Sequence, residues 1–140
     1  MTARLTVIGI AVRDMGRSLE FYRLLGLDIA PDQAGEAHVE AELEGGITLM
    51  FDTDELMASF DAAYAPASGR GRISLAFACG SPADVDSVHE TVVAAGHTSH
   101  LAPFDAPWRQ RYASVHDPDG NSVDLFAPLD DDPSTVLDST

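Results

Sequence analysis

The chain has 140 residues, 45% of them hydrophobic and 22% charged, which is the size and composition of one folded domain and excludes a disordered chain. Eight basic residues against 23 acidic ones give a formal net charge of −15, so we expect neither nucleic acid nor an anionic membrane as a partner, whereas cations would be attracted. The apolar runs are too short to cross a bilayer and the N-terminus lacks the features of a signal peptide, so we expect a cytoplasmic protein.

Residues 1–64 predict a strand, a helix and three further strands. The helix begins after Asp14, whose carboxylate can cap it, and Gly26 can end it. Gly45 and Gly46 can turn the chain between the last two strands. The strands are predicted from apolar runs and alternating residues at 5–12, 27–30, 37–44 and 47–52.

Residues 72–129 repeat this order. Ser81 and Pro82 can begin a helix that Gly96 ends. The strands are predicted at 72–78, 97–102, 112–116 and 121–127. Residues 65–71 are rich in Pro, Gly and Ser and read as a linker, and residues 130–140 read as a flexible acidic tail.

The predicted fold is therefore α+β, with two βαβββ modules in one domain. A four-stranded sheet with a helix on one face leaves its other face uncovered. Two such sheets can form one curved mixed sheet around a shared cleft, which is the natural place for a small ligand.

The stretch His116 to Asp124 is dense in polar side chains, and a calcium loop is one interpretation. It fails because, with Asp117 at position 1, glycine falls at position 4 and Pro128 at position 12. Pro118 and Gly120 instead fit a β-hairpin turn. That turn leaves Asp124 in mid-strand.

Three stretches resemble one known family. They are VRDMGRSLEFYRLLGL, GGITLMFD and RYASVHDPDGNSVDLFAP. Together with the repeat, they are similar to the vicinal oxygen chelate superfamily, which includes glyoxalase I, extradiol dioxygenases and the fosfomycin and bleomycin resistance proteins. The region around Trp108, the strand at 47–52 and His38 most resemble its metal-free drug-binding group, typified by the mitomycin resistance protein. The resemblance implies a homodimer with a cleft at the subunit interface.

The metal enzymes of this superfamily place one ligand on each of four strands. The matching positions here are Val7, Met50, Arg72 and Asp124. Valine and arginine cannot ligate a divalent ion, methionine is a soft ligand, and one carboxylate is not enough. Cys79 is the only cysteine, so no cysteine-based zinc site exists. We therefore expect no metal and no cofactor.

Without a metal, the cleft would be lined by aromatic and acidic side chains. Trp108 and Tyr112 lie at the loop that enters the last hairpin, and flat amphipathic rings suit stacking. The ligand-binding residues that we expect are Val7, His38, Met50, Phe51, Asp52, Phe104, Trp108, Tyr112, Asp124 and Phe126.

These features favour a binding protein over an enzyme. Its ligand would be a planar aromatic or cationic small molecule, either an antibiotic that is sequestered to confer resistance or a natural product carried in its producer. Two alternatives stay open. One is a metal-free enzyme of the same superfamily that uses Asp124 or His38 as a general acid–base, and the other is a metal-dependent enzyme of the glyoxalase or dioxygenase type.

Overall fold

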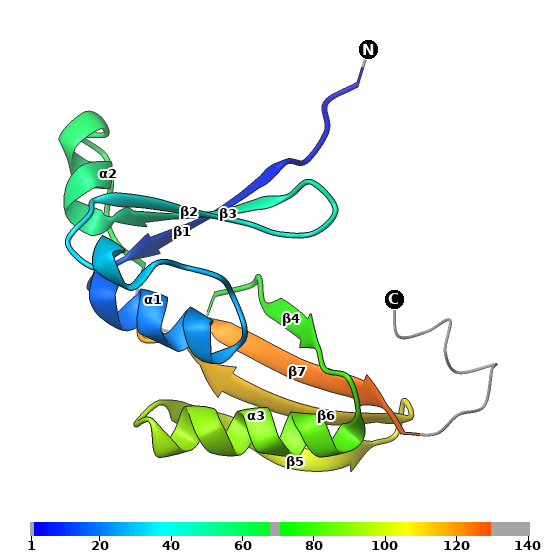
Figure 1. Cartoon of the computed structure of the whole chain (residues 1–140). Coiled ribbons are helices and arrows are strands. Elements are labelled where there is room, and N and C mark those ends of the chain that lie inside the picture. The colour runs from blue at the N-terminus through cyan, green and yellow to red at the C-terminus, as the bar shows by residue number, and fades with distance from the viewer. Residues whose placement is uncertain (1, 68–70, 130–140) are drawn as a thin grey trace. The chain divides into compact units, whose positions relative to one another are not determined.

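The computed structural model describes residues 2–67 and 71–129 (Figure 1). The chain divides into two compact units, residues 1–68 and 69–140, with the boundary inside the predicted linker at 65–71. The predicted tail at 130–140 lies outside the described residues. Within the described ranges, no helix is both long and apolar enough to cross a membrane.

The first unit is a mixed sheet with helices attached (Figure 1). Its described elements are β1 (Val7–Val12), α1 (Met15–Leu24), the 3₁₀-helix η1 (Pro31–Gln33), β2 (His38–Glu42), β3 (Thr48–Thr53) and α2 (Asp54–Phe60). The strand order is β1-β3-β2, with β1 parallel and β2 antiparallel to β3. The predicted pairing across Gly45 and Gly46 is confirmed.

The strand predicted at 27–30 is wrong. The guanidinium of Arg23 donates to the carbonyl oxygens of Ile29 and Ala30, each at 2.7 Å. These acceptors are therefore taken by a side chain, and Pro31 has no N–H to offer a partner strand. The short helix α2 was not predicted; the hydroxyl of Thr53 caps it by accepting from the amide of Leu56 at 3.1 Å.

Helix α1 covers one face of the first sheet. Asp14 caps it as predicted by accepting from the amide of Arg17 at 3.1 Å, and Gly26 follows its end at a φ of 101°. Its buried ring of Tyr22 packs against Phe51 at 5.2 Å between centroids. Because alternate strand residues point to opposite faces, every second residue of β2 and β3 lies on the face that α1 does not cover, where β2 is exposed and β3 is partly buried.

The second unit is a four-stranded sheet covered by one helix (Figure 1). Its elements among residues 71–129 are β4 (Leu75–Ala78), α3 (Pro82–Ala94), β5 (Thr98–Ala106), β6 (Gln110–His116) and β7 (Ser122–Pro128). The strand order is β4-β7-β6-β5, in which β4 is parallel to β7 and the other pairs are antiparallel. The predicted α+β class is confirmed, and among the described residues the first sheet has three strands where four were predicted.

Two strand boundaries in this unit differ from those predicted by three or four residues. β4 begins at Leu75 instead of at residue 72, because its partner β7 begins only at Ser122, after the turn. β5 continues past Pro103 to Ala106. It is an edge strand whose register shifts between Leu101 and Phe104, and a proline is tolerated at such a place.

The turn between β6 and β7 is the predicted hairpin turn. The carboxylate of Asp117 accepts from the amides of Asp119 and Asn121 at 3.0 and 2.8 Å, and from the side-chain amide of Asn121 at 2.8 Å. Gly120 has a φ of 87°. Helix α3 packs on the side of the sheet that holds Val115 and Leu125. The turn thereby directs Asp124 to the face opposite α3, which we call the open face of the second sheet.

Candidate functional site

Three aromatic rings gather on the second unit. Trp108 lies in the tight turn between β5 and β6, where Arg109 has a φ of 68° and its amide donates to the carbonyl of Ala106 at 3.0 Å. The Trp108 ring meets Tyr112 at 5.3 Å and 84°, and Phe104 at 6.2 Å and 88°. Phe104 and Tyr112 lie 6.1 Å apart at 74°. These edge-to-face contacts hold the rings at steep angles to one another.

The tryptophan ring is held in place yet accessible. Trp108 is 53% exposed, and its indole Nε1 donates to Oε1 of Gln110 at 3.0 Å. A large apolar ring that remains exposed although its edge is anchored can receive a flat partner.

Asp124 lies next to this aromatic group. In the strand register Tyr112 faces Phe126 and Ser114 faces Asp124, and the hydroxyl of Tyr112 donates to Oδ2 of Asp124 at 2.5 Å. Ser122 donates to the other carboxylate oxygen at 3.3 Å. Burial first, and then the hydrogen bond to Asp124, raise the pKa of Tyr112 to about 12. The phenol therefore stays protonated at neutral pH and keeps donating to the carboxylate.

A pocket of about 280 Å³ adjoins the Tyr112–Asp124 pair on the second unit. The loop before β4 forms part of its wall, and β5, β6 and β7 form the rest. Its lining residues are Gly71, Arg72, Ile73, Ser74, His100, Leu101, Tyr112, Ser114, Ser122 and Asp124. Most of the side chains are hydroxyls or ionisable groups, so the pocket suits a polar part of a ligand.

Several of these pocket residues were not among the predicted binding residues. The prediction includes Arg72 only at a matched metal position, and His100 and Leu101 only within the strand at 97–102. The prediction placed residues 72–74 in a strand, whereas the structure leaves them as a loop beside the pocket. The sequence does indicate the turn that ends at Asn121. Residues 72–74 would lie beside that turn and therefore have no neighbouring strand with which to pair.

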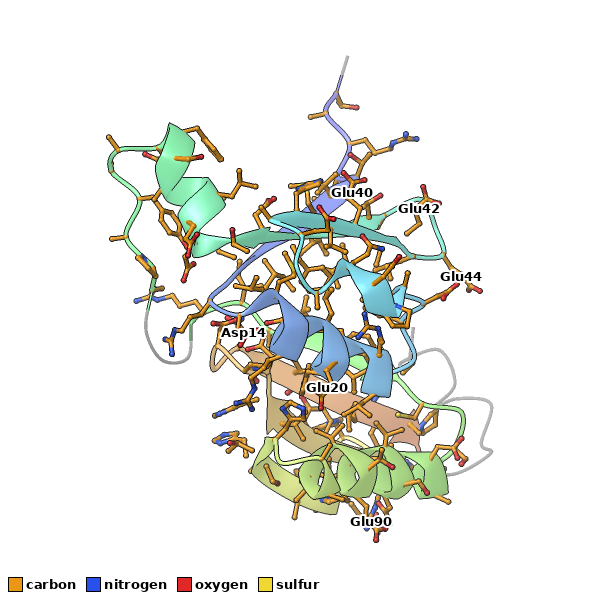
Figure 2. The ribbon with its side chains drawn as sticks, turned by 60° about the vertical axis from the view of Figure 1, so that its left-hand side comes forward. Asp14, Glu20, Glu40, Glu42, Glu44 and Glu90 are labelled. Carbon is orange, nitrogen blue, oxygen red and sulfur yellow. The ribbon has the colours of Figure 1, made fainter. Side chains whose placement is uncertain are left out.

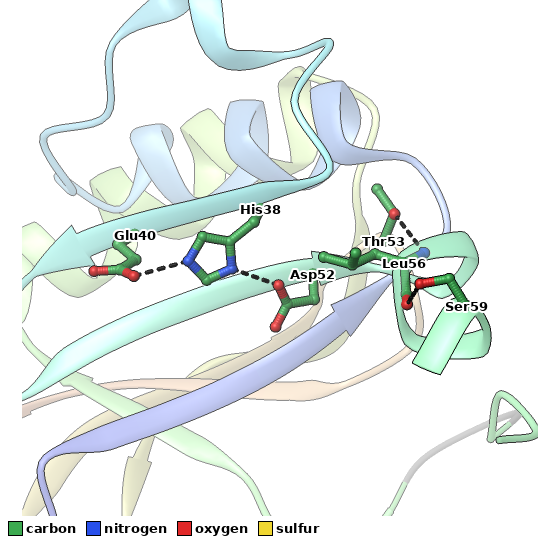
Figure 3. A network of polar contacts seen from close by, with 6 residues as sticks. All are labelled: His38, Glu40, Asp52, Thr53, Leu56 and Ser59. Atoms are coloured by element: carbon green, nitrogen blue, oxygen red, sulfur yellow. Dashed lines mark hydrogen bonds and ion pairs between the residues drawn. The ribbon is translucent and has the colours of Figure 1, made fainter. Parts of the chain in front are cut away.

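A second polar group lies on the first unit (Figure 3). Nδ1 of His38 is 2.5 Å from Oδ1 of Asp52, and Nε2 of His38 is 2.7 Å from Oε2 of Glu40. The strand pairing causes this, because His38 on β2 faces Asp52 on β3 and Glu40 is two residues further along β2. Hydrogen bonds first to Glu40 and then to Asp52 raise the pKa of His38 above its ordinary value. The arrangement favours an imidazolium that donates from both nitrogens.

The sheet face around His38 is acidic. Figure 2 shows Glu40 and Glu42 along β2 and Glu44 in the turn that follows it. All three are exposed. These three carboxylates contribute to the formal net charge of −15, and they favour cations over anions on this unit.

The remaining predicted residues are divided between surface and core. Val7 is 42% exposed, and Met50 is partly buried on the same sheet face as Asp52. Phe126 is partly buried beside Tyr112. The prediction that Phe51 faces the ligand is corrected: Phe51 is 0% exposed and packs on Tyr22, since it points to the helix side of β3.

The side chains at the matched metal positions do not fit a divalent ion. Val7 and Met50 offer no hard donor, and the guanidinium of Arg72 has no acceptor atom with which to ligate a divalent ion. Among residues 2–67 and 71–129, no three His, Cys, Asp or Glu side chains are arranged to hold a metal. In the His38 group, both ring nitrogens already face carboxylates.

Solved structures with this fold include proteins of several bacteria. A protein of unknown function from Agrobacterium tumefaciens is 26% identical, with a TM-score of 0.68, over 92% of this chain and 97% of that one. A glyoxalase/bleomycin resistance protein/dioxygenase from Nocardioides is 24% identical, with a TM-score of 0.71, over 94% and 87%. A lactoylglutathione lyase from Agrobacterium tumefaciens is 19% identical, with a TM-score of 0.63, over 91% and 95%.

No curated protein matches the sequence. The sequence model of the Glyoxalase/Bleomycin resistance protein/Dioxygenase superfamily matches residues 4–125, which is most of the chain. The sheets and helices of the two units agree with the modules of that family. The chain therefore belongs to the glyoxalase/bleomycin resistance protein/dioxygenase superfamily.

Proposed function

We propose that this protein binds a planar aromatic, cationic small molecule without a metal, as the drug-binding members of its superfamily do. It would confer resistance to that molecule by sequestering it. The observation that carries the proposal is the exposed Trp108 ring in contact with Phe104 and Tyr112, together with the carboxylate of Asp124, which accepts a hydrogen bond from the same Tyr112. The contacts among Phe104, Trp108, Tyr112 and Asp124 support assigning these four predicted residues to one proposed binding site.

Stacking and charge supply separate parts of the affinity. A ligand ring laid against Trp108 gains about 1–3 kcal/mol from stacking and burial. A positive group on that ring gains further from Asp124 and from the aromatic faces, because cations are attracted to both. The side chains at the four metal positions support binding without a metal, since they offer one carboxylate and no second hard donor.

The test is a titration with proflavine, a planar aromatic cation. Trp108 is the only tryptophan, so quenching of protein fluorescence reports on this ring directly. Calorimetry should show that Trp108→Ala weakens proflavine binding about ten- to a hundredfold. This factor follows from the lost stacking energy, since about 1.4 kcal/mol corresponds to a tenfold change in affinity.

The control is Phe60→Ala, which removes another exposed aromatic ring, 69% exposed on α2. Both variants should melt close to the wild-type temperature, and the control should bind as the wild type does. If proflavine does not bind the wild type, or binds a folded Trp108→Ala protein equally well, the proposal is wrong.

We also propose a homodimer. The uncovered sheet faces carry apolar side chains such as Val7 and Met50, and two-fold pairing is the commonest way to cover such surfaces. Light scattering at micromolar concentration should give twice the mass of the chain, 14.9 kDa. A monomer under these conditions would contradict this part of the proposal.

The His38–Asp52 contact favours a second candidate, a metal-free enzyme. A histidine whose ring is oriented by a carboxylate can act as a general acid–base. If this candidate holds, a ligand incubated with the wild type is converted to a product of different mass, and His38→Gln abolishes the conversion. Recovery of intact ligand from the wild type would support the binding protein alone.

A further inference from the structure

Two opposite charges line the pocket of the second unit without neutralising each other. Arg72 lies on the loop before β4, and Asp124 lies on β7. Within the described residues, no ion pair joins them, and Arg72 forms none with any other acid. Each charge is therefore available to a ligand.

Arg111 shows by contrast how this unit neutralises an arginine that has a structural role. Its guanidinium donates to both carboxylate oxygens of Asp86, at 2.9 and 3.1 Å, and to Asp105 at 2.9 Å. Arg72 has an equal set of five donors and, among residues 2–67 and 71–129, no such partners. The planar fork of an arginine matches a carboxylate group in a bidentate manner.

Asp124 keeps capacity for a cation. Its two oxygens accept one hydroxyl each, from Tyr112 and Ser122, whereas a carboxylate has about four acceptor positions. Neutral hydroxyl donors fix the orientation of the carboxylate and do not cancel its charge. An ammonium group of a ligand could donate hydrogen bonds to the remaining acceptor positions of the Asp124 carboxylate.

The pocket accommodates only part of a ligand. Its volume of about 280 Å³ lies at the lower limit of ordinary ligand sites. Tyr112 belongs both to the pocket and to the aromatic group, since its hydroxyl faces Asp124 and its ring meets Trp108. A ligand can therefore place its polar end in the pocket while its ring lies on Trp108.

We propose that the ligand is amphoteric, with an amine that pairs with Asp124 and a carboxylate that pairs with Arg72. This inference rests on the proposed binding function and narrows its ligand class from cations to molecules that carry both charges. Ser74 and Ser114 add hydroxyls beside the two charged groups, so a polar backbone between amine and carboxylate would also find partners.

The experiment uses four probes that share one naphthalene ring. They are 3-(2-naphthyl)alanine, which carries both charges, 2-(2-naphthyl)ethylamine, 3-(2-naphthyl)propionate and the neutral 2-(2-naphthyl)ethanol. Calorimetry at pH 7 should rank the amino acid tightest, about three- to tenfold better than the amine. The factor is modest because Arg72 is exposed to solvent.

Arg72→Gln should remove this advantage. The amino acid should then bind no better than the amine. The affinity of the alcohol should stay unchanged, and that of the amine should stay unchanged or rise, because a positive charge near its ammonium group is removed. Arg4→Gln is the matched control, because it removes the same charge from an exposed residue of the first unit. Only a local contact distinguishes the two variants, since each lowers the net charge equally. Melting temperatures verify that both remain folded.

The outcomes separate the two proposals. If the probes bind through Trp108 but Arg72→Gln changes nothing, or if the amine binds wild type better than the amino acid does, the amphoteric ligand is refuted and the aromatic site stands. If no probe binds, both proposals fall. If the amino acid loses its affinity advantage in both arginine variants, that advantage comes from the long-range effect of net charge, and the role of Arg72 is refuted.

Discussion

Single residues in this protein take their roles from the neighbours that the fold gives them. His38 and His89 show this with opposite results. His38 lies between two carboxylates, which raise its pKa. His89 accepts or donates one hydrogen bond with Ser99 at 2.7 Å, and burial lowers its pKa. The same residue type is therefore stabilised in its charged form on one unit and in its neutral form on the other.

These opposite shifts predict opposite pH dependences of stability. A raised pKa in the folded state means that His38 contributes to stability fully below its unfolded pKa of about 6.5 and loses that contribution as pH rises through the folded value. A lowered pKa means that His89 costs stability as pH falls below about 6.5. His38→Gln should therefore lower the melting temperature more at pH 5.5 than at pH 8.5.

His89→Gln is the control with the opposite sign. Its melting temperature relative to wild type should be more favourable at pH 5.5 than at pH 8.5, because glutamine has no proton to gain. Each effect is small, since both side chains contact solvent. Scanning calorimetry at the two pH values measures both differences, and equal differences for the two variants would contradict the assignment of the His38 contacts.

Elements were predictable where local chemistry decides them. Capping by Asp14 and the positive φ of Gly26 bound α1, and the turn that Asp117 organises could be identified from its residue types. The strand at 27–30 was predicted wrongly because the long side chain of Arg23 reaches its carbonyls, and no periodicity records such a contact. Propensity describes a segment alone, whereas a strand also needs a partner.

The candidate site was predictable in part for the same reason. Alternation along β3 places Asp52 and Phe51 on opposite faces, so the residue pattern of this strand was enough to assign Phe51 to the face opposite Asp52. The pairing of His38 with Asp52 needed the register, which the glycine turn fixes. The pocket beside Arg72 needed the place where β4 begins, and that depends on β7, about 50 residues later in the chain. Side-chain direction was thus accessible from sequence, whereas contacts between distant segments were not.

At the scale of the whole molecule, strong acidity is combined with Arg72 at the pocket, an arginine that forms no ion pair within the part of the chain that the structure describes. A chain of net charge −15 concentrates cations around it and repels anions. An anionic group can then be selected only by a local contact, and Arg72 is the residue placed to make one. The overall field and the local contact together favour a ligand that carries both signs of charge.

Metal content tests the position of this protein within its superfamily. The matched positions hold Val7, Met50, Arg72 and Asp124, which cannot supply the donors that a divalent ion needs. We expect elemental analysis of the purified protein to find far less than one Zn, Ni, Fe or Mn per chain. A metal that binds only the folded state stabilises it by mass action, so its removal would lower the melting temperature. Because we expect no bound metal, treatment with EDTA should leave the melting temperature unchanged. Adding Zn²⁺ or Ni²⁺ back after EDTA is the control, and it should not raise the melting temperature either. About one equivalent of metal that is lost together with stability on chelation, and regained with it, would mean that the protein belongs with the metal enzymes of the superfamily, and it would remove the main support for a binding protein.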